Sequence, residues 1–287
     1  MTVTLPPHLS HSQLTGYSAC GERHRLERLL KVPTRPAWAL IGGGAFHRAT
    51  EEVDHALLAG NPMEEPYITD FSELLEQEKN EVLARTDGFA EEDIRASGRA
   101  SKAWPDKENR QWWEFNGPVM VGKWIDFVQV APWDLWVTPD GEPAIEVEVN
   151  PQYGEAKVKG FIDRIFQMRD TGDLIIVDLK SGATKPKSPQ QLGQYASDIR
   201  KKYGVEVWGG AYYDARSGIT SEVYDLSRYT EEFFAYQYES VKRAREAGIF
   251  LPVVADHCGW CQVKDHCYGV GGARSNEVPR PWEMKFE

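Results

Sequence analysis

The sequence predicts an α/β fold, because helix-like and strand-like patterns follow one another in an ordered series. Apolar residues recur at helical spacing near the N-terminus and again after residue 186, whereas they alternate with polar residues between residues 145 and 179. The predicted order is helix, three strands, helix, two strands and helix. That order is typical of an α/β core.

The first two helices are set by capping and breaking residues. One helix is predicted to begin at Ser10 and to continue toward Leu30, with Cys20 in its middle. Prolines at positions 33 and 36 break it, and a second helix is predicted over residues 42–60.

The second predicted helix carries a histidine that could act as a metal ligand. His47 and Glu51 are four residues apart and share one helical face. A lone histidine on a helix is more often structural or exposed than a ligand. We therefore expect His47 to bind a metal only if acidic residues from elsewhere in the chain lie beside it.

Residues 61–140 are acidic, aromatic and mostly helical in pattern. Helices are predicted over 70–85, 90–97, 107–115 and 119–136, separated by glycines and prolines. This stretch contains no chemical motif. We interpret it as a helical insertion that could wall a substrate channel.

The stretch from Gly160 to Lys180 predicts a β-hairpin that follows a strand over residues 145–149. Two apolar alternating runs, 158–168 and 174–179, flank the turn signal Asp170–Asp173. The first run contains Asp163, and the second ends in Asp178 and Lys180, which share one face of their strand.

This hairpin has the residue types of a metal-dependent phosphodiesterase. Two carboxylates held close together repel each other unless a cation lies between them, and oxygen ligands suit Mg²⁺ or Mn²⁺. A lysine beside the metal can hold a water nucleophile or stabilise charge on a phosphate. The alternative is that Asp163, Asp178 and Lys180 are ordinary exposed residues near a turn, which is the more frequent outcome for this tripeptide pattern alone.

The remaining elements complete the predicted core. A helix over 186–203 ends at Gly204 and carries Gln191 and Tyr195 four residues apart. Strands are predicted over 205–213 and 220–226, and a last helix over 229–247.

Composition excludes some classes of protein. The chain of 287 residues has a net charge of −11, from 33 basic and 44 acidic residues, which argues against a non-specific nucleic-acid coat protein. It still allows an enzyme that binds DNA through a local patch.

No apolar run is long enough to span a bilayer, and the N-terminus does not resemble a signal peptide, so we expect a cytoplasmic protein with no membrane partner. Two basic runs, 23–31 and 180–202, could each be solvated helix surface.

Three of the four cysteines lie close together near the C-terminus. Cys258, Cys261 and Cys267 have the spacing C-x2-C-x5-C, which indicates a metal or cluster site. Three sulfurs require a fourth ligand, and Cys20 is the one other cysteine. Zinc is the alternative occupant, with Cys20, His257 or His266 as its fourth ligand.

In this order, the motifs resemble the PD-(D/E)XK nuclease superfamily, in its RecB-like and AddB-like branch with a four-cysteine iron–sulfur cluster. The CRISPR-associated four-cysteine exonuclease is similar. The resemblance covers most of the chain apart from about residues 61–140. It lies in S-x-S-x-L-x-x-Y-x-x-C ending at Cys20, G-G-A-F-H-R-A-T-E around His47, G-F-I-D ending at Asp163, D-L-K ending at Lys180, Q-L-G-Q-Y from Gln191 to Tyr195, and the closing cysteines. Gly21 stands where that branch often has proline.

The resemblance implies a restriction-endonuclease-like core, a mixed central sheet flanked by helices, that hydrolyses DNA with Mg²⁺ or Mn²⁺. His47, Asp163, Asp178 and the Leu179 carbonyl would bind the metal, and Lys180 would orient the attacking water. Gln191 and Tyr195 would position Lys180 or the DNA. Glu51 and Glu148 are further candidate acids near the metal.

The resemblance also implies a [4Fe–4S] cluster on Cys20, Cys258, Cys261 and Cys267. It predicts a single nuclease domain over residues 1–287, with an insertion (61–140), a catalytic core (141–250) and a cysteine tail (251–287) that packs on the helix around Cys20.

The expected activity is that of a DNA exonuclease on single strands or free ends, acting in recombination, repair or end processing, with a helicase or recombination partner. No helicase P-loop occurs in the sequence. The alternatives are a CRISPR-adaptation nuclease, or a catalytically idle iron–sulfur DNA-binding subunit of a helicase–nuclease complex.

Overall fold

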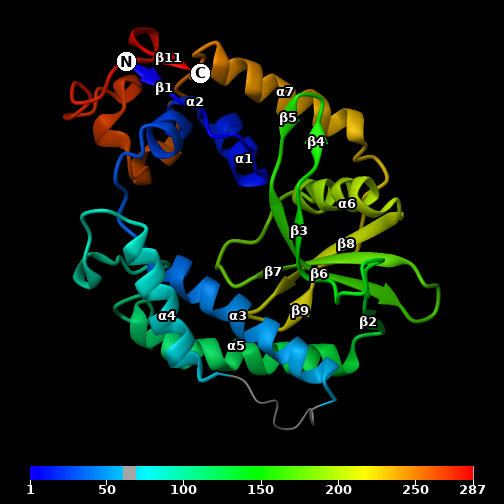
Figure 1. Ribbon diagram of the computed structural model, residues 1–287. Helices are drawn as coiled ribbons and strands as arrows, with labels where there is room; N and C mark the ends of the chain where they lie inside the picture. The colour runs from blue at the N-terminus through cyan, green and yellow to red at the C-terminus, as the bar shows by residue number, and fades with distance from the viewer. Residues whose placement is uncertain (61–68, 287) are drawn as a thin grey trace. The chain divides into compact units, whose positions relative to one another are not determined.

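The computed structural model of the protein describes residues 1–60 and 69–286 (Figure 1). The chain forms two compact units, each built from segments that are distant in sequence. We call the larger one the sheet unit; it contains Arg35–Glu148 and Phe161–Arg228. We call the other the cysteine unit; it contains Met1–Thr34, Val149–Gly160 and Tyr229–Glu287.

A mixed seven-stranded sheet is the centre of the sheet unit, as the α/β prediction requires. Its strands are β2 (Trp133–Leu135), β3 (Ile145–Val149), β6 (Gly160–Met168), β7 (Leu174–Lys180), β8 (Val207–Asp214), β9 (Ile219–Thr220) and β10 (Tyr224–Asp225). The order is β10-β8-β7-β6-β2, with β3 paired to β6 and β9 to β8. The pair β7–β8 is parallel, and the helix α6 (Gln190–Tyr203) connects these two strands.

Helices cover both faces of this sheet (Figure 1). Every residue of β7 from Leu174 to Leu179 is buried, which explains its almost continuous apolar sequence. Helix α6 lies over one face, and the other face packs against the helices α3 (Trp38–Leu58) and α5 (Arg110–Val130), on which α4 (Phe71–Ala84) packs in turn. The prediction of a central mixed sheet flanked by helices is therefore confirmed.

Helix α5 corrects two of the predicted helices. The sequence favoured separate helices over 107–115 and 119–136, but one helix runs through Pro118 and is followed by strand β2. The fully buried Trp113 and Trp124 anchor the two halves of the helix in one core, so packing outweighs the missing hydrogen bond at the proline. Gly117 fits because the ring of Phe71 fills the space that a Cβ atom would need.

Other predicted elements change in extent. The predicted helix over 90–97 is only a 3-10 turn, Glu91–Asp93, and the predicted strand over 220–226 is two short strands, β9 and β10. Helix α3 begins at Trp38, four residues earlier than expected, and α6 begins at Gln190. The assignment of 61–140 as an insertion stays a prediction, and residues 61–68 of it lie outside the described residues.

The N-terminal helix of the cysteine unit is not continuous, contrary to the prediction. Helix α1 (His11–Ala19) begins at the predicted cap Ser10 and ends before Cys20, whose backbone is extended. The chain then forms the short helix α2 (Gly21–His24) and a π-helical turn, Arg25–Leu29. A Cβ atom at Gly21 would lie 2.9 Å from the amide nitrogen of Leu251, so glycine allows this close backbone approach.

The rest of the cysteine unit joins the two ends of the chain. Strand β1 (Thr2–Val3) pairs in parallel with β11 (Lys285–Phe286), and the hairpin β4–β5 (Gln152–Tyr153 and Ala156–Lys157) packs on helix α7 (Glu231–Glu246). The cysteine tail consists of short 3-10 turns, Asp256–Trp260, Lys264–His266, Tyr268–Val270 and Pro281–Glu283. Among the helices of residues 1–60 and 69–286, none has the length and apolar character required to cross a membrane.

Candidate functional site

The hairpin predicted between Gly160 and Lys180 is present and holds its acidic residues in a fixed register. Strands β6 and β7 are antiparallel, with Arg164 opposite Val177. The buried side chain of Asp163 accepts a hydrogen bond of 2.6 Å from the amide of Leu179. This bond ties the first acid of the hairpin to the strand that carries Asp178 and Lys180.

Three side chains of the sheet unit come together as a group that could hold a metal ion. Ligand atoms of His47, Glu146 and Asp163 all lie within 4.8 Å of one another. His47 Nδ1 is 3.6 Å from Glu146 Oε1 and 3.7 Å from Asp163 Oδ1. An imidazole nitrogen and two carboxylate oxygens suit a divalent cation such as Mg²⁺ or Mn²⁺, so the donor set fits the predicted metal.

Glu146 is the member of this group that sequence analysis missed. The alternating sequence Ile-Glu-Val-Glu-Val drew attention to Glu148, which is exposed, and gave no reason to prefer Glu146. The backbone of Glu146 has a φ of +46°, a left-handed conformation that is strained for a residue other than glycine. Such strained residues concentrate at functional sites. Glu51, the other acid suggested by the sequence, lies 4.0 Å from His55.

A fully buried arginine supports the group from behind. Arg164 donates to the carbonyl of Asp163 at 2.6 Å and to Glu146 Oε1 at 3.3 Å. Its Nε donates to Asp54 Oδ2 at 2.5 Å, and Asp54 also accepts from the Trp124 indole at 2.9 Å. The positive charge of Arg164 is thus compensated, and it fixes the side chain of Glu146 and the backbone of Asp163.

Lys180 lies at the centre of a second set of contacts. Its Nζ is 2.6 Å from Asp178 Oδ2 and donates to Gln191 Oε1 at 3.1 Å. The Gln191 amide in turn donates to the hydroxyl of Tyr195 at 2.9 Å. Gln191 and Tyr195 are one helical turn apart on α6, so this helix holds the lysine in place through a hydrogen-bonded chain.

Burial and neighbouring charges change the ionisation of two site residues. Burial alone lowers the pKa of His47, but the carboxylates of Asp163 and Glu146 outweigh burial and raise that pKa to about 9. Burial raises the pKa of Asp178 to about 7; Asp163 adds to this shift, and Lys180 opposes it. Without a cation, the site therefore holds protons near neutral pH. A divalent ion would replace them.

The four cysteines lie in the cysteine unit, where they line one small cavity of about 20 Å³. The amide of Val253 donates to Cys20 Sγ at 3.4 Å, and Cys258 Sγ donates to the Val253 carbonyl at 3.7 Å. In the part of the chain that the structure describes, no three of the sulfurs lie within 4.8 Å of one another. The buried Nε2 of His257, on the same cavity wall, has no hydrogen-bond partner among the described residues.

Comparison with known proteins agrees with the motifs. The PD-(D/E)XK nuclease superfamily matches residues 8–268, a range that includes all four cysteines and the whole His47–Lys180 region. The Gene 69 protein of Mycobacterium phage L5 is 29% identical over 93% of this chain and 98% of its own length. The Gene 69 protein of Mycobacterium phage D29 is 28% identical with the same coverage. Because the superfamily match covers residues 8–268 and includes the acidic hairpin of this chain, the chain belongs to the PD-(D/E)XK nuclease superfamily.

Proposed function

We propose that this protein is a metal-dependent DNA exonuclease that acts in recombination, repair or end processing. The observation that carries the proposal is the group of His47, Glu146 and Asp163 beside Asp178 and Lys180, in a chain of the PD-(D/E)XK superfamily. His47, Glu146 and Asp163 provide ligands for a divalent cation, and Lys180 provides a positive charge beside them. Metal-dependent phosphodiester hydrolysis can use both.

His47, Glu146 and Asp163 would hold Mg²⁺ or Mn²⁺ together with Asp178 and the Leu179 carbonyl. The amide of Leu179 points toward Asp163 on β6. Because the N–H and C=O groups of one strand residue point to the same neighbouring strand, its carbonyl points in that direction too. When bound, the metal would polarise the scissile phosphate and stabilise the leaving oxygen.

Lys180 would orient the attacking water and stabilise negative charge on the phosphate. Its ion pair with Asp178 keeps the ammonium next to the carboxylates. Gln191 accepts from the same ammonium, and Tyr195 fixes the Gln191 amide, so both residues position Lys180. Burial and the nearby Asp178 raise the pKa of Tyr195, so Tyr195 acts as a neutral hydrogen-bonding group.

The cavity lined by Cys20, Cys258, Cys261 and Cys267 would hold a [4Fe–4S] cluster. Four thiols on one cavity supply all the ligands that such a cluster needs. Tetrahedral zinc would require all four sulfurs to lie about 3.8 Å apart, from Zn–S bonds of about 2.3 Å, whereas no three sulfurs of the described residues lie within 4.8 Å of one another. His257 Nε2 has no hydrogen-bond partner among the described residues, and the sulfur atoms of a bound cluster would give it one.

The experiment that tests the proposal uses linear DNA labelled at either the 5′ or the 3′ end, with circular DNA of the same sequence as the control. Anaerobically purified protein with Mn²⁺ should shorten the linear DNA from one end and leave the circle intact. The label that is released first gives the polarity. Cleavage of the circle at the same rate would show an endonuclease. Binding without cleavage of either DNA would favour a non-catalytic DNA-binding subunit.

A further inference from the structure

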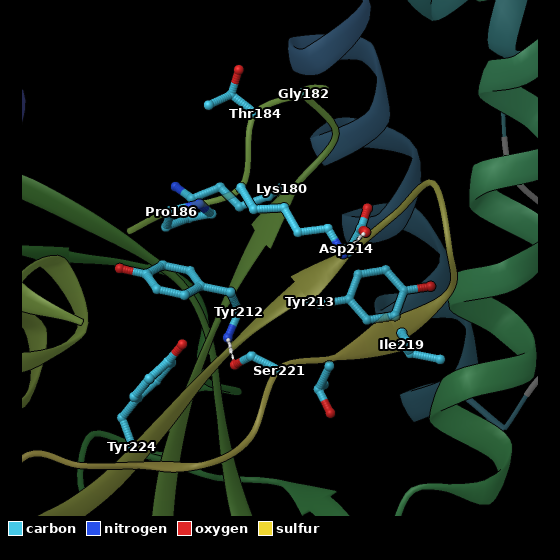
Figure 2. A pocket seen from close by; sticks show the side chains of 12 residues that line it. Lys180, Gly182, Thr184, Pro186, Tyr212, Tyr213, Asp214, Ile219, Ser221 and Tyr224 are labelled. Atoms are coloured by element: carbon cyan, nitrogen blue, oxygen red, sulfur yellow. Dashed lines mark hydrogen bonds and ion pairs between the residues drawn. The ribbon is translucent and has the colours of Figure 1, made fainter. Parts of the chain in front are cut away.

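A pocket of about 120 Å³ opens in the sheet unit next to Lys180 (Figure 2). Its walls come from the loop that follows β7 and from the strands β8, β9 and β10. Figure 2 shows Tyr212 and Tyr224 next to each other on one wall, with Lys180 and Pro186 near the ring of Tyr212. Neither tyrosine belongs to the motifs that the sequence singled out.

The Tyr212 ring is held in place and is only 5% exposed, so it forms the floor of the pocket, while the ring of Tyr224 beside it is partly exposed. Its hydroxyl donates to the carbonyl of Ser188 at 2.9 Å, and its amide donates to Ser221 Oγ at 3.1 Å. The ring of Tyr224 meets it edge to face, with ring centroids 6.2 Å apart. Flat aromatic side chains held in this way form platforms on which nucleobases stack.

The same lysine faces both this pocket and the acidic group. Lys180 Nζ lies 5.7 Å from the centroid of the Tyr212 ring, while its distance to Asp178 is 2.6 Å. A phosphate held by Lys180 would therefore have its attached nucleoside within reach of the pocket. Asp214, the one carboxylate among the described residues of the wall, is compensated by Lys185 at 3.0 Å and by the Ser217 hydroxyl at 2.9 Å. An incoming DNA strand would therefore meet little repulsion there.

We propose that this pocket binds the nucleobase next to the scissile phosphate, stacked on the partly exposed ring of Tyr224 and edge-on to the ring of Tyr212. This inference rests on the proposed nuclease function and adds a substrate-binding site to it. The Ser221 hydroxyl already donates to the Glu222 carbonyl, and the Tyr212 hydroxyl is engaged with Ser188. These two hydroxyls are occupied, and those of Thr184 and Thr220 also line the pocket. Because a hydroxyl can donate or accept, it would not distinguish the bases, so stacking would hold the base and all four bases would be accepted.

The test uses end-labelled oligonucleotides that each carry one abasic residue at a different distance from the end. The wild type with Mn²⁺ should pause at the bond whose neighbouring base is missing and cleave it about 5- to 150-fold more slowly than its neighbours. Tyr224→Ala should slow cleavage at every position by a similar factor and show no extra pause. The matched control is Tyr236→Ala, which changes an exposed tyrosine of helix α7 and should behave as the wild type does.

A binding measurement separates failure of this inference from failure of the nuclease function. An oligonucleotide with 2-aminopurine at the pausing position, or at the end if nothing is cleaved, is mixed with protein in Ca²⁺. Stacking in the pocket should quench its fluorescence with the wild type and Tyr236→Ala, and much less with Tyr224→Ala. The inference is wrong if the wild type passes abasic positions without a pause, or if Tyr224→Ala quenches as strongly as the wild type. Absence of all cleavage would contradict the proposed function, and the quenching would still decide the pocket.

Discussion

The candidate metal group and the cysteine cavity are built in different ways. The metal group lies on long elements, with His47 on the 21-residue helix α3 and Asp163 on the nine-residue strand β6. Cys258 lies in a 3-10 turn and Cys261 and Cys267 at the ends of turns, and none of the three turns over residues 256–270 contains a buried residue. The acidic site is supported by long elements of the large core, whereas the cysteine loop rests on a small cluster in which Val263 and Cys267 pack with Leu26 and Val32.

This difference predicts that the fold depends less on a divalent cation at the acidic site than on a group bound by the cysteines. Arg164, Asp54 and the Leu179 amide already hold the acidic residues in place, so the sheet unit should keep its structure without a divalent cation. The cysteine tail buries few apolar side chains, chiefly Val263, Cys267, Met284 and Phe286, so a group bound by its three thiols and by Cys20 would add stabilisation.

The largest effect is expected on activity, from Asp178→Asn. The variant removes a charge that lies 2.6 Å from Lys180 Nζ, and DNA cleavage should fall by about 10³-fold. Stability should not fall above pH 7, because burial disfavours the native carboxylate. Cleavage rates and thermal unfolding measure both effects, with Asp173→Asn in the exposed hairpin turn as the control. If the Asp178→Asn protein does not fold, the proposed difference in stability between the two sites is wrong.

Cys258→Ser is expected to lower stability, in contrast to Asp178→Asn, which is expected to lower activity and leave stability intact. The purified variant should lose its iron, and the free energy of unfolding should fall by about 3 kcal/mol or more, as is typical when a structural metal site is lost. Iron analysis and denaturant unfolding test this. His266→Asn serves as the control, because it removes a candidate zinc ligand and should leave the iron content unchanged. Zinc in place of iron in the wild type would overturn the cluster proposal.

A smaller effect is expected on Mn²⁺ affinity, and it should differ between the two glutamates of strand β3. Glu146→Gln should weaken Mn²⁺ binding by about 10- to 100-fold, since it removes a carboxylate ligand of the metal group. Glu148→Gln, two residues away and exposed, should bind Mn²⁺ as the wild type does. Titration of Mn²⁺ by calorimetry distinguishes them. Equal affinities for the two variants would remove Glu146 from the metal site.

The smallest effect is on the pH dependence of stability in EDTA. The folded protein holds a proton on His47 up to a pKa of about 9, above the value near 6.5 in the unfolded chain. This contribution is complete below pH 6.5 and is lost as the pH rises through 9. Stability should fall across that range by about 1–2 kcal/mol, less than the pKa difference alone would give, because the imidazole is 31% exposed and screened by water. Denaturant unfolding at several pH values should show the fall for the wild type and not for His47→Gln. With Mn²⁺ the trend should reverse, because the metal displaces these protons.

Local patterns predicted most of the acidic site from the sequence. The hairpin that carries Asp163, Asp178 and Lys180 follows from strand alternation around a turn, and the contact between Gln191 and Tyr195 follows from helical spacing. Glu146 could not be found in this way. Its position depends on a left-handed backbone conformation that strand alternation does not indicate.

The cysteine unit shows the same limit. The break at Cys20 lies next to Gly21, where the backbone of Leu251 comes close from more than 200 positions away in sequence, and no local pattern predicts that approach. Arg25 appears in the sequence as part of a basic run, yet it is fully buried. Both of its hydrogen bonds to Glu22 are 2.8 Å long, and a third reaches the Pro279 carbonyl. Pairing of this kind depends on the folded tail.

The central claim is that the His47–Glu146–Asp163 group supports metal-dependent cleavage of DNA. Its most direct test is the rate at which anaerobically purified protein releases label from linear DNA as Mn²⁺ is added, for the wild type and for Asp163→Asn. The wild type should degrade the DNA only when Mn²⁺ is present, and Asp163→Asn should be inactive at every concentration. A wild type that is inert with both Mn²⁺ and Mg²⁺, or an Asp163→Asn protein that is equally active, would contradict the claim.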